Sequence, residues 1–233
     1  MGEKRMLTLR SLAGLDSLFE KKELKAMVEQ RLREQNSEGR YWEWKLQGPF
    51  ATGVKKGTKY RIVKAIVSFA NTAGGFIVFG VDSSGKWVGL DKEELGEFDT
   101  AKITEIVNGC ITPDITEFSI YFSRVRRKKF VILHVPPSKL MPHVTTKEVF
   151  EQTEDNRRRV ILKKHTVYCR FSGKSDVARY ADYQRIIKGR LDVLREALLR
   201  RFKEVTVGKA RYCQMLWIEF FSGSIAEPLR GLF

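Results

Sequence analysis

The sequence predicts an α+β fold, in which a mixed, mostly antiparallel sheet is flanked by helices. Apolar residues recur at helical spacing before the motif at 71–75, whereas 76–79 is continuously apolar, as in a buried strand. Two later runs, 117–122 and 129–135, alternate apolar and polar residues, which is typical of paired strands. With 233 residues and a hydrophobic fraction of 42%, the chain can bury the core of one domain, or of one domain with an appendage.

The elements expected along the chain alternate helices with short strands. In the first half they are an amphipathic helix at 16–35, a strand near 40–46, a basic glycine-containing loop at 48–59 and a helix at 59–70. A strand at 75–81 follows, and a turn at 83–85 joins it to 86–89 as a hairpin. In the second half they are a helix at 97–109, the two alternating strands, further strands at 158–163 and 166–170, and a helix at 179–203.

These elements divide the chain into four parts. We expect a helical N-terminal segment (1–35), a central domain (36–180), a C-terminal helix (181–204) and an apolar tail (205–233). In the simplest interpretation the apolar residues of the C-terminal helix face the core; in a sharper one they form a dimer seam. The tail is either an extra strand or a docking element for a second subunit.

The charge of the chain limits its partners. Lys and Arg number 43 against 28 acids, a formal net charge of +15, which favours DNA or RNA over an anionic membrane surface. No apolar run reaches the roughly 18 residues of a membrane span. Three widely spaced cysteines suit buried thiols in a reducing compartment, so the expected location is the cytoplasm.

Three loop-borne clusters carry much of the positive charge. They comprise Lys55 and Lys56; Arg124, Arg126, Arg127, Lys128 and Lys129; and Arg157, Arg158, Arg159, Lys163 and Lys164. One such cluster alone is typical of a solvated turn, but three beside the net charge predict a face that follows a phosphate backbone. No helix-turn-helix or zinc-finger pattern accompanies them, so we expect recognition by shape and backbone, as for structured RNA.

Acidic residues form a second constellation. In a strand at 40–46, Trp42 and Trp44 point to the core, while Tyr41, Glu43 and Lys45 share the opposite face. A turn at Gly39 permits Glu38 to approach Glu43, and Asp82 ends the strand at 75–81; if the two strands are neighbours, three carboxylates converge. Such a cluster favours Mg²⁺ or Mn²⁺, with Lys45 assisting electrostatically. The alternative is structural, with Glu43 and Lys45 as a surface ion pair and Glu38 as a solvated acid.

The order of these motifs resembles the AlbA-type domain of the Schlafen family, over roughly residues 35–180. The matching stretches are Glu38-x4-Glu43-x-Lys45, Phe69-Ala-Asn-Thr-x-Gly-Gly75, Gly80-Val-Asp82, Val131 to Pro137, Pro142-His143 and Tyr168-x-Arg170-x-x-Gly173-Lys-Ser175. The resemblance implies a Schlafen-core-like lobe and a nucleic-acid partner, and it places Arg170 among the nucleic-acid-binding residues. One departure is Asp82-Ser83, where some members carry two acids.

The same resemblance implies a function and a site. It predicts a metal-dependent endoribonuclease acting on structured, tRNA-like RNA, with Glu38, Glu43 and Asp82 as catalytic metal ligands and Lys45 steadying the phosphate. The alternative is a non-catalytic DNA-binding module with a regulatory or architectural role; a protein-binding scaffold has less support. Because Schlafen cores often use two lobes, a homodimer through the C-terminal helix and tail is also open to this chain.

Overall fold

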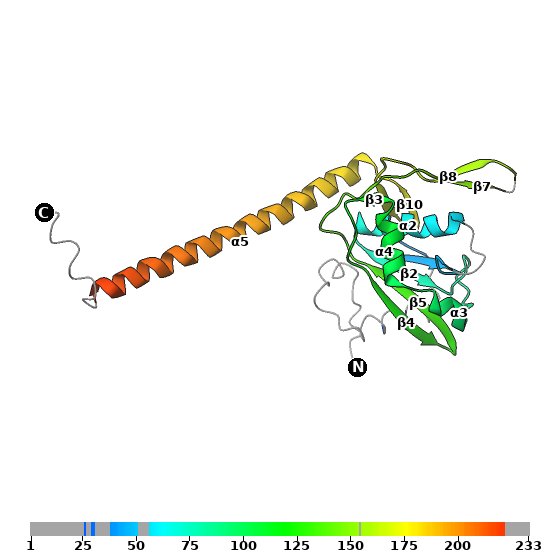
Figure 1. Cartoon of the computed structure of the whole chain (residues 1–233), viewed down its shortest axis with the longest axis horizontal. Coiled ribbons are helices and arrows are strands. Elements are labelled where there is room, and N and C mark those ends of the chain that lie inside the picture. Colours follow the sequence, from blue (N-terminus) through cyan, green and yellow to red (C-terminus); the bar gives the residue numbers. More distant parts are fainter. Residues whose placement is uncertain (1–25, 27–28, 31–37, 51–55, 154, 222–233) are drawn as a thin grey trace, which may run out of the picture. The chain divides into compact units, whose positions relative to one another are not determined.

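The computed structural model describes residues 26, 29–30, 38–50, 56–153 and 155–221, and for residues 56 and 205–221 it describes the backbone (Figure 1). The chain divides into two compact units, Met1–Ile186 and Ile187–Phe233, and each is described by itself. The helix expected at 16–35 falls almost wholly outside the described residues.

A four-stranded mixed sheet forms the centre of the first unit (Figure 1). The strand order is β1 (Trp42–Lys45), β2 (Gly75–Phe79), β5 (Lys128–Val135), β4 (Ser119–Val125). β1 and β2 are parallel, because a helical crossover connects them, while β2–β5 and β5–β4 are antiparallel. The predicted α+β fold with a mixed, mostly antiparallel sheet is thus confirmed.

Three two-stranded sheets surround this centre within the described residues. They pair β3 (Ile111–Thr112) with β6 (Val144–Thr145), β7 (Val149–Gln152) with β8 (Arg158–Leu162), and β9 (Tyr168–Phe171) with β10 (Lys174–Val177). The strands predicted at 158–163 and 166–170 are β8 and β9. Each pairs with a short neighbour that the sequence analysis did not identify.

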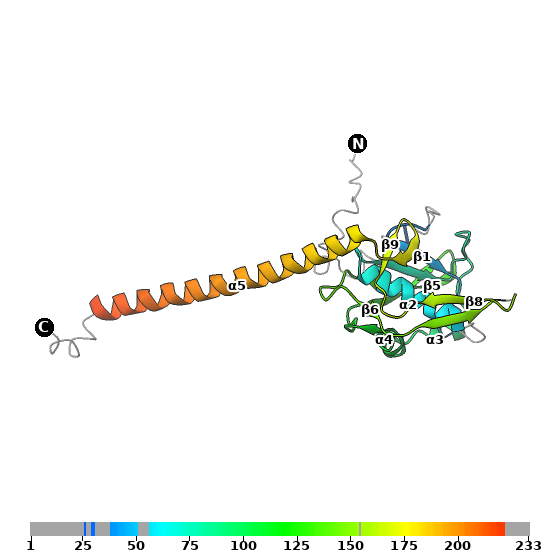
Figure 2. The same ribbon diagram turned by 90° about the horizontal axis from the view of Figure 1, so that it is seen from above.

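The central sheet separates two apolar clusters. On one face Trp42 and Trp44, 4% and 5% exposed, pack with Phe76, Val78 and Phe130. The opposite face is covered by α2 (Lys56–Ala70), which lies across the sheet in both views (Figures 1 and 2). The alternation predicted for β1 is therefore confirmed for its two tryptophans, although Tyr41, in the preceding turn, packs against the tryptophan cluster.

Two short helices follow β2, and carboxylates cap both. Asp91 begins α3 (Lys92–Gly96) with a capping box that includes Glu94, and the Asp99 side chain accepts from the Ala101 amide at the start of α4 (Thr100–Asn108). The helix predicted at 97–109 is α4; the Asp99 cap explains its later start. Beyond it, Cys110 and, on β9, Cys169 are buried free thiols, as predicted.

The turn after α2 fastens this helix to distant strands. The buried Asn71 side chain accepts from the His143 amide at 2.7 Å and donates to the carbonyls of His143 and Tyr168, at 2.9 and 3.1 Å. Gly74 has φ +72, and a Cβ there would lie 2.8 Å from the Val135 carbonyl oxygen. The Asn-Thr-x-Gly-Gly motif thus holds the end of α2 against distant segments. Glycine is needed at position 74 both for its positive φ and for the close approach of the Val135 backbone.

The second unit contains most of α5 (Tyr180–Phe221), a helix that continues well beyond its expected end near 203. Residues 205–221, expected as a separate tail, extend this helix, and 222–233 lies outside the described residues. Ile186 is buried, whereas Ile187, Leu191, Leu194, Leu198 and Phe202 are each more than half exposed. Ile186, at the end of the first unit, is thus buried as the core-facing interpretation predicts, and the homodimer stays a prediction. None of the described helices combines the length and apolarity needed to cross a bilayer.

Replacement of Asn71 tests whether its side-chain hydrogen bonds stabilise the fold. We expect Asn71→Ala to lower the free energy of unfolding by about 3 kcal/mol, because it leaves buried backbone groups of His143 and Tyr168 without partners. Urea-induced unfolding measures this loss, with Gln47→Ala at an exposed position as the control. A loss no larger than that of the control would contradict the role assigned to Asn71.

Burial of His143 makes stability depend on pH. The side chain is fully buried, its Nδ1 lies 2.7 Å from the Pro113 carbonyl oxygen, and Nε2 is buried without a hydrogen-bond partner. Burial lowers the pKa of His143, while the Pro113 carbonyl and Asp114 oppose this shift.

Because the folded pKa is lowered, the unfolded chain takes up the proton first, and stability is lost as pH falls below about 6.5. When the pH is lowered from 7.5 to 5.5, the free energy of unfolding should therefore fall less in His143→Gln than in the wild type. The exposed His165→Asn serves as control. Equal pH dependence in wild type and His143→Gln would contradict this account.

Candidate nucleic-acid interface and its acidic network

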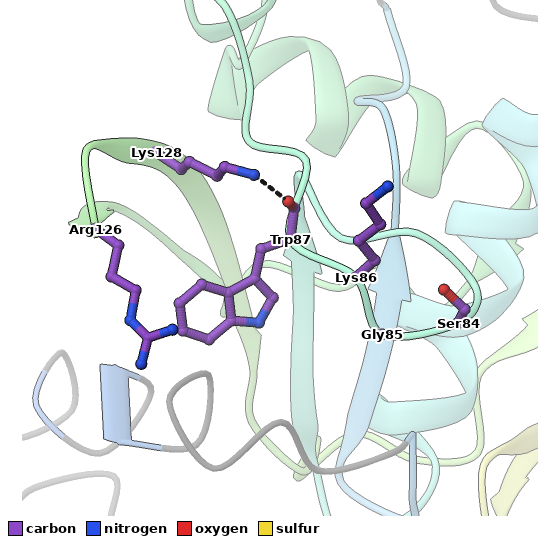
Figure 3. A pocket seen from close by; sticks show the side chains of 6 residues that line it. All are labelled: Ser84, Gly85, Lys86, Trp87, Arg126 and Lys128. Atoms are coloured by element: carbon purple, nitrogen blue, oxygen red, sulfur yellow. Dashed lines mark hydrogen bonds between the residues drawn. The ribbon is translucent and has the colours of Figure 1, made fainter.

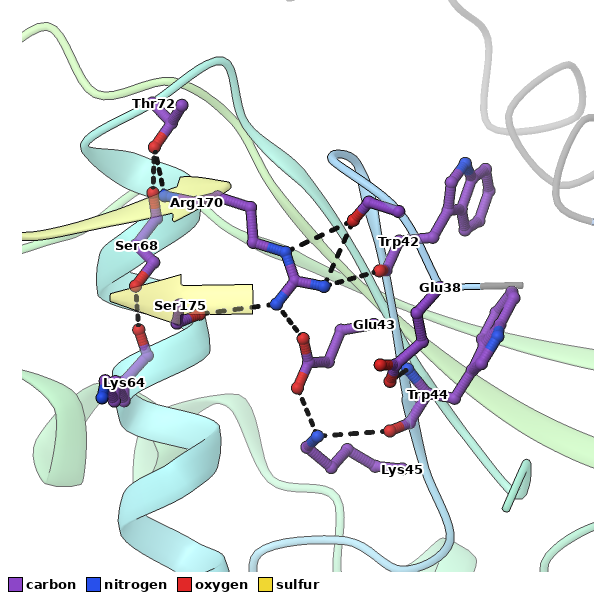
Figure 4. A network of polar contacts seen from close by, with 11 residues as sticks. Glu38, Trp42, Glu43, Trp44, Lys45, Lys64, Ser68, Thr72, Arg170 and Ser175 are labelled. Atoms are coloured by element: carbon purple, nitrogen blue, oxygen red, sulfur yellow. Dashed lines mark hydrogen bonds and ion pairs between the residues drawn. The ribbon is translucent and has the colours of Figure 1, made fainter. Parts of the chain in front are cut away.

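The face of β1 that α2 covers carries Glu43 and Lys45 (Figure 4). The Glu43 side chain is 12% exposed, and each of its oxygens meets a cation: Oε1 accepts from Lys45 Nζ and Oε2 accepts from Arg170 Nη1. The ion pair of Glu43 with Lys45, considered as the structural alternative, is present, but both side chains are mostly buried and the pair does not lie at the surface. The second partner comes from a strand 127 positions away.

Arg170 lies on β9, with its side chain 1% exposed. Its Nη2 donates to the Trp42 carbonyl at 2.8 Å and to the Gly39 carbonyl at 3.2 Å, and its guanidinium lies 5.0 Å from the Phe69 ring centre. The expectation that Arg170 contacts nucleic acid is wrong, because burial and these bonds leave no accessible surface for a phosphate. Arg170 instead joins the β9–β10 hairpin to β1.

Glu38 lies at the tight turn that precedes β1. Gly39 and Trp42 exchange backbone hydrogen bonds across this turn, and Glu38 Oε1 accepts from the Trp44 amide at 2.8 Å. Since β1 is an edge strand, that amide needs a partner outside the sheet, and Glu38 supplies it. The turn at Gly39 therefore exists as expected, but it directs Glu38 to the backbone.

Asp82 follows the end of β2 and closes its own turn. Its Oδ1 accepts from the Ser84 hydroxyl at 2.7 Å and from the amides of Ser84 and Lys86, both at 2.9 Å. These bonds, led by the one from the Ser84 hydroxyl, lower the pKa of Asp82. The preceding Val81 amide donates to the Lys45 carbonyl, so Asp82 lies near the end of β1. The predicted hairpin is present as a bridge between Val81 and Trp87.

The three acids do not form a metal-binding set as placed. No group of three or more His, Cys, Asp or Glu side chains in the described part of the chain is arranged to hold a metal ion. Both Glu43 oxygens already pair with cations, and Asp82 Oδ1 accepts three hydrogen bonds. The arrangement thus does not fit a shared Mg²⁺ or Mn²⁺, and the catalytic role of Glu38, Glu43, Asp82 and Lys45 stays a prediction.

The cluster at 124–129 forms one wall of a basic hollow of about 480 Å³, which we call the Trp87 pocket (Figure 3). Positive φ angles at Arg126 and Arg127 close the β4–β5 turn. The Arg126 guanidinium lies 5.3 Å from the Trp87 ring centre, and Lys128 Nζ donates to the Trp87 carbonyl. Lys86 and Ser84 complete the opposite wall, so the pocket offers cations beside an aromatic ring.

The cluster at 157–164 surrounds the β7–β8 hairpin. Arg157, Arg158, Lys163 and Lys164 are exposed, and the Arg158 guanidinium stacks 3.8 Å from the Phe150 ring centre. Lys55 lies outside the described residues, as does the side chain of Lys56. The surface position expected for these four cations is confirmed, whereas their contact with nucleic acid stays a prediction.

Sequence reasoning missed one cation on the buried side of α2. Lys64 is half-buried, with its Nζ 4.4 Å from the Tyr168 ring centre. Burial lowers the pKa of Lys64, nearby Lys174 lowers it further, and Asp176 opposes them. The sequence does contain a signal for it, since Lys64 is the one charged residue in the apolar stretch 62–67 of this helix.

The fold and the site together define an α+β domain with a buried carboxylate–guanidinium centre and a basic hollow at its surface. The family described as Schlafen, AlbA_2 matches residues 38–178, more than half of the chain. The chain therefore belongs to the Schlafen AlbA_2 family, as its motifs predict.

Similarity to individual proteins is more distant. The chain is 21% identical over 192 residues to an uncharacterised ATP-binding protein of Ureaplasma parvum; the alignment covers 78% of this chain and 52% of that protein, so the chain spans about half the relative's length.

Two solved structures are also similar, each 16% identical to this chain. One is a protein from Corynebacterium diphtheriae, with a TM-score of 0.44 over 70% of this chain and 32% of that one. The other is the N-terminal domain of a RecG-related protein from Nitrosomonas europaea, with a TM-score of 0.35 over 66% of this chain and 94% of that one. Because these TM-scores are low, neither similarity supports a functional conclusion.

Separate substitutions of Glu43 and Asp82 distinguish the structural roles of these two acids. We expect Glu43→Gln to lower the free energy of unfolding by about 3 kcal/mol, because it leaves the buried Arg170 without a counter-charge. Asp82→Asn, at a solvent-accessible turn, should change the unfolding midpoint much less. Chemical denaturation of both variants measures the difference, and equal losses would contradict the assignment of Glu43 to the fold.

Proposed function

We propose that this chain is a nucleic-acid-binding protein that holds the phosphate backbone through its basic surface and whose motif acids maintain the fold. The observation that carries this proposal is the separation of charges. Within the described residues, no ion pair involves Arg126, Lys128 or Lys86 of the Trp87 pocket, while Glu43 is enclosed with Arg170 and Lys45. The surface cations therefore remain available to an external polyanion.

Family membership and charge support the same proposal. A net charge of +15 favours a polyanionic partner, and the resemblance to Schlafen proteins implies nucleic acid. The similarity to a RecG-related protein is too low to add to it. Structured, tRNA-like RNA and duplex DNA are both candidate ligands, since contacts to a backbone do not depend on base sequence.

The second candidate is a metal-dependent endoribonuclease. One observation favours it: the parallel pairing of β1 with β2 places Asp82 just beyond a strand that neighbours the one bearing Glu43. For this function Glu43 would have to exchange its cationic partners for a metal ion. Asp82→Asn is the cleaner probe of cleavage, because Glu43→Gln also perturbs the fold.

The binding proposal predicts a steep dependence on salt. The logarithm of the affinity for labelled tRNA or duplex DNA, measured by fluorescence anisotropy, should fall linearly with the logarithm of salt concentration. Arg126→Asn with Lys86→Gln should weaken binding and reduce the slope, while the control Lys92→Gln with Lys188→Gln, at exposed positions elsewhere, should change it less. Affinity that does not depend on salt would overturn the proposal.

Cleavage is scored in the same samples with Mn²⁺, Mg²⁺ or EDTA. We expect both the wild type and Asp82→Asn to bind tRNA and to leave it intact under all three conditions. Metal-dependent cleavage by the wild type that is lost in Asp82→Asn would instead support the endoribonuclease and contradict the non-catalytic function.

A further inference from the structure

Two adjoining hollows lie beside α2, on elements that do not form the Trp87 pocket. They have volumes of about 450 and 310 Å³ and share Tyr60 and Lys147 in their linings, so we describe them together as the Tyr60 groove. α2 contacts α4, β7 and β8, and residues of these elements line the two hollows. An ion pair between Arg61 and Glu151 joins α2 to β7.

The groove is strongly basic. Its lining includes five cations, Lys59, Lys102, Lys147, Arg158 and Lys164, against two acids, Glu105 and Glu148. No ion pair among the described residues involves any of these five cations. Cys110 shares the lining with Lys59 and Lys147; burial raises the pKa of its thiol, while the two lysines lower it.

Aromatic rings alternate with these cations. Tyr60 is half-buried at the junction of the two hollows, Phe150 lines one of them under the Arg158 guanidinium, and Phe50 lines the other with Lys59 Nζ 5.4 Å from its ring centre. Half-buried rings and a stacked guanidinium plane offer flat apolar surfaces to unpaired bases, while the ammonium groups between them suit phosphates.

We propose that the Tyr60 groove binds a single-stranded segment of nucleic acid, with a base stacked on Tyr60 and phosphates held by Lys102 and Lys147. A single strand fits this lining better than a duplex, because the bases of a duplex are stacked on one another and cannot reach recessed aromatic rings. The inference rests on the proposed function and extends it by naming the form of the ligand and the residues that select it.

The test separates stacking from charge by fluorescence anisotropy with labelled oligo(U) and oligo(dT) of about 12 nucleotides, compared with a blunt duplex of equal length. Tyr60→Ser should weaken single-strand binding by about five- to 150-fold without changing the salt slope, since stacking on one base is lost. Tyr60→Phe should restore binding, which a purely structural role of the tyrosine hydroxyl would not allow.

Lys102→Gln with Lys147→Gln should instead reduce the salt slope by about 1.4, the value for two phosphate contacts on a single strand. Lys92→Gln with Lys188→Gln is the matched control, and circular dichroism confirms that each variant is folded. Unchanged single-strand affinity in both groove variants, or tighter binding of the duplex than of the single strand, would overturn the groove proposal alone. Absence of binding to any nucleic acid by the wild type would overturn the proposed function as well.

Discussion

The buried ion pair between Arg170 and Glu43 is the interaction on which the site depends. Removing a guanidinium and a carboxylate from water costs several kcal/mol per ion, and the cost is offset only when the remaining hydrogen-bonding groups are satisfied. Here the Arg170 nitrogens donate to two backbone carbonyls of the β1 turn, and Lys45 pairs with the other Glu43 oxygen. The turn at Gly39, the register of β1 and the position of the β9–β10 hairpin therefore depend on one another.

This arrangement has a consequence for chemistry. A carboxylate that already holds two cations has little capacity for a third, so Glu43 acts as a structural group in this conformation. Among the described residues, cations without an ion pair line the Trp87 pocket and the Tyr60 groove, and aromatic rings lie beside them. Rings beside cations are the combination that binds both the bases and the phosphates of an unpaired strand.

Local patterns predicted much of the fold and part of the site. The alternation in β1 correctly separates Trp42 and Trp44 from Glu43 and Lys45, and the glycine pair after Asn71 marks the change from helix to strand. The Asp82 turn was also readable, since aspartate followed by Ser-Ser-Gly favours a side-chain-capped turn.

The remaining features depend on contacts between distant parts of the chain. Nothing near Arg170 in the sequence indicates that Glu43 is its partner, and a tyrosine at position 60 has the helical spacing of an ordinary core residue. Short strands such as β7 and β10 cannot be recognised from hydrophobic periodicity, because four residues contain too few alternations of apolar and polar side chains. The length of α5 was underestimated because an apolar stretch at 215–221 suits a docking tail as well as a helix.

A double-mutant cycle on Glu43 and Arg170 tests most directly whether this acid belongs to the fold. Glu43→Gln, Arg170→Met and the double variant are compared with the wild type by urea unfolding. The account predicts that each single substitution costs about 3 kcal/mol and that the double variant loses less than the sum by about 1–3 kcal/mol, because neither charge then remains buried alone. Losses that add to within about 0.5 kcal/mol would contradict it and would return Glu43 to a role outside the fold.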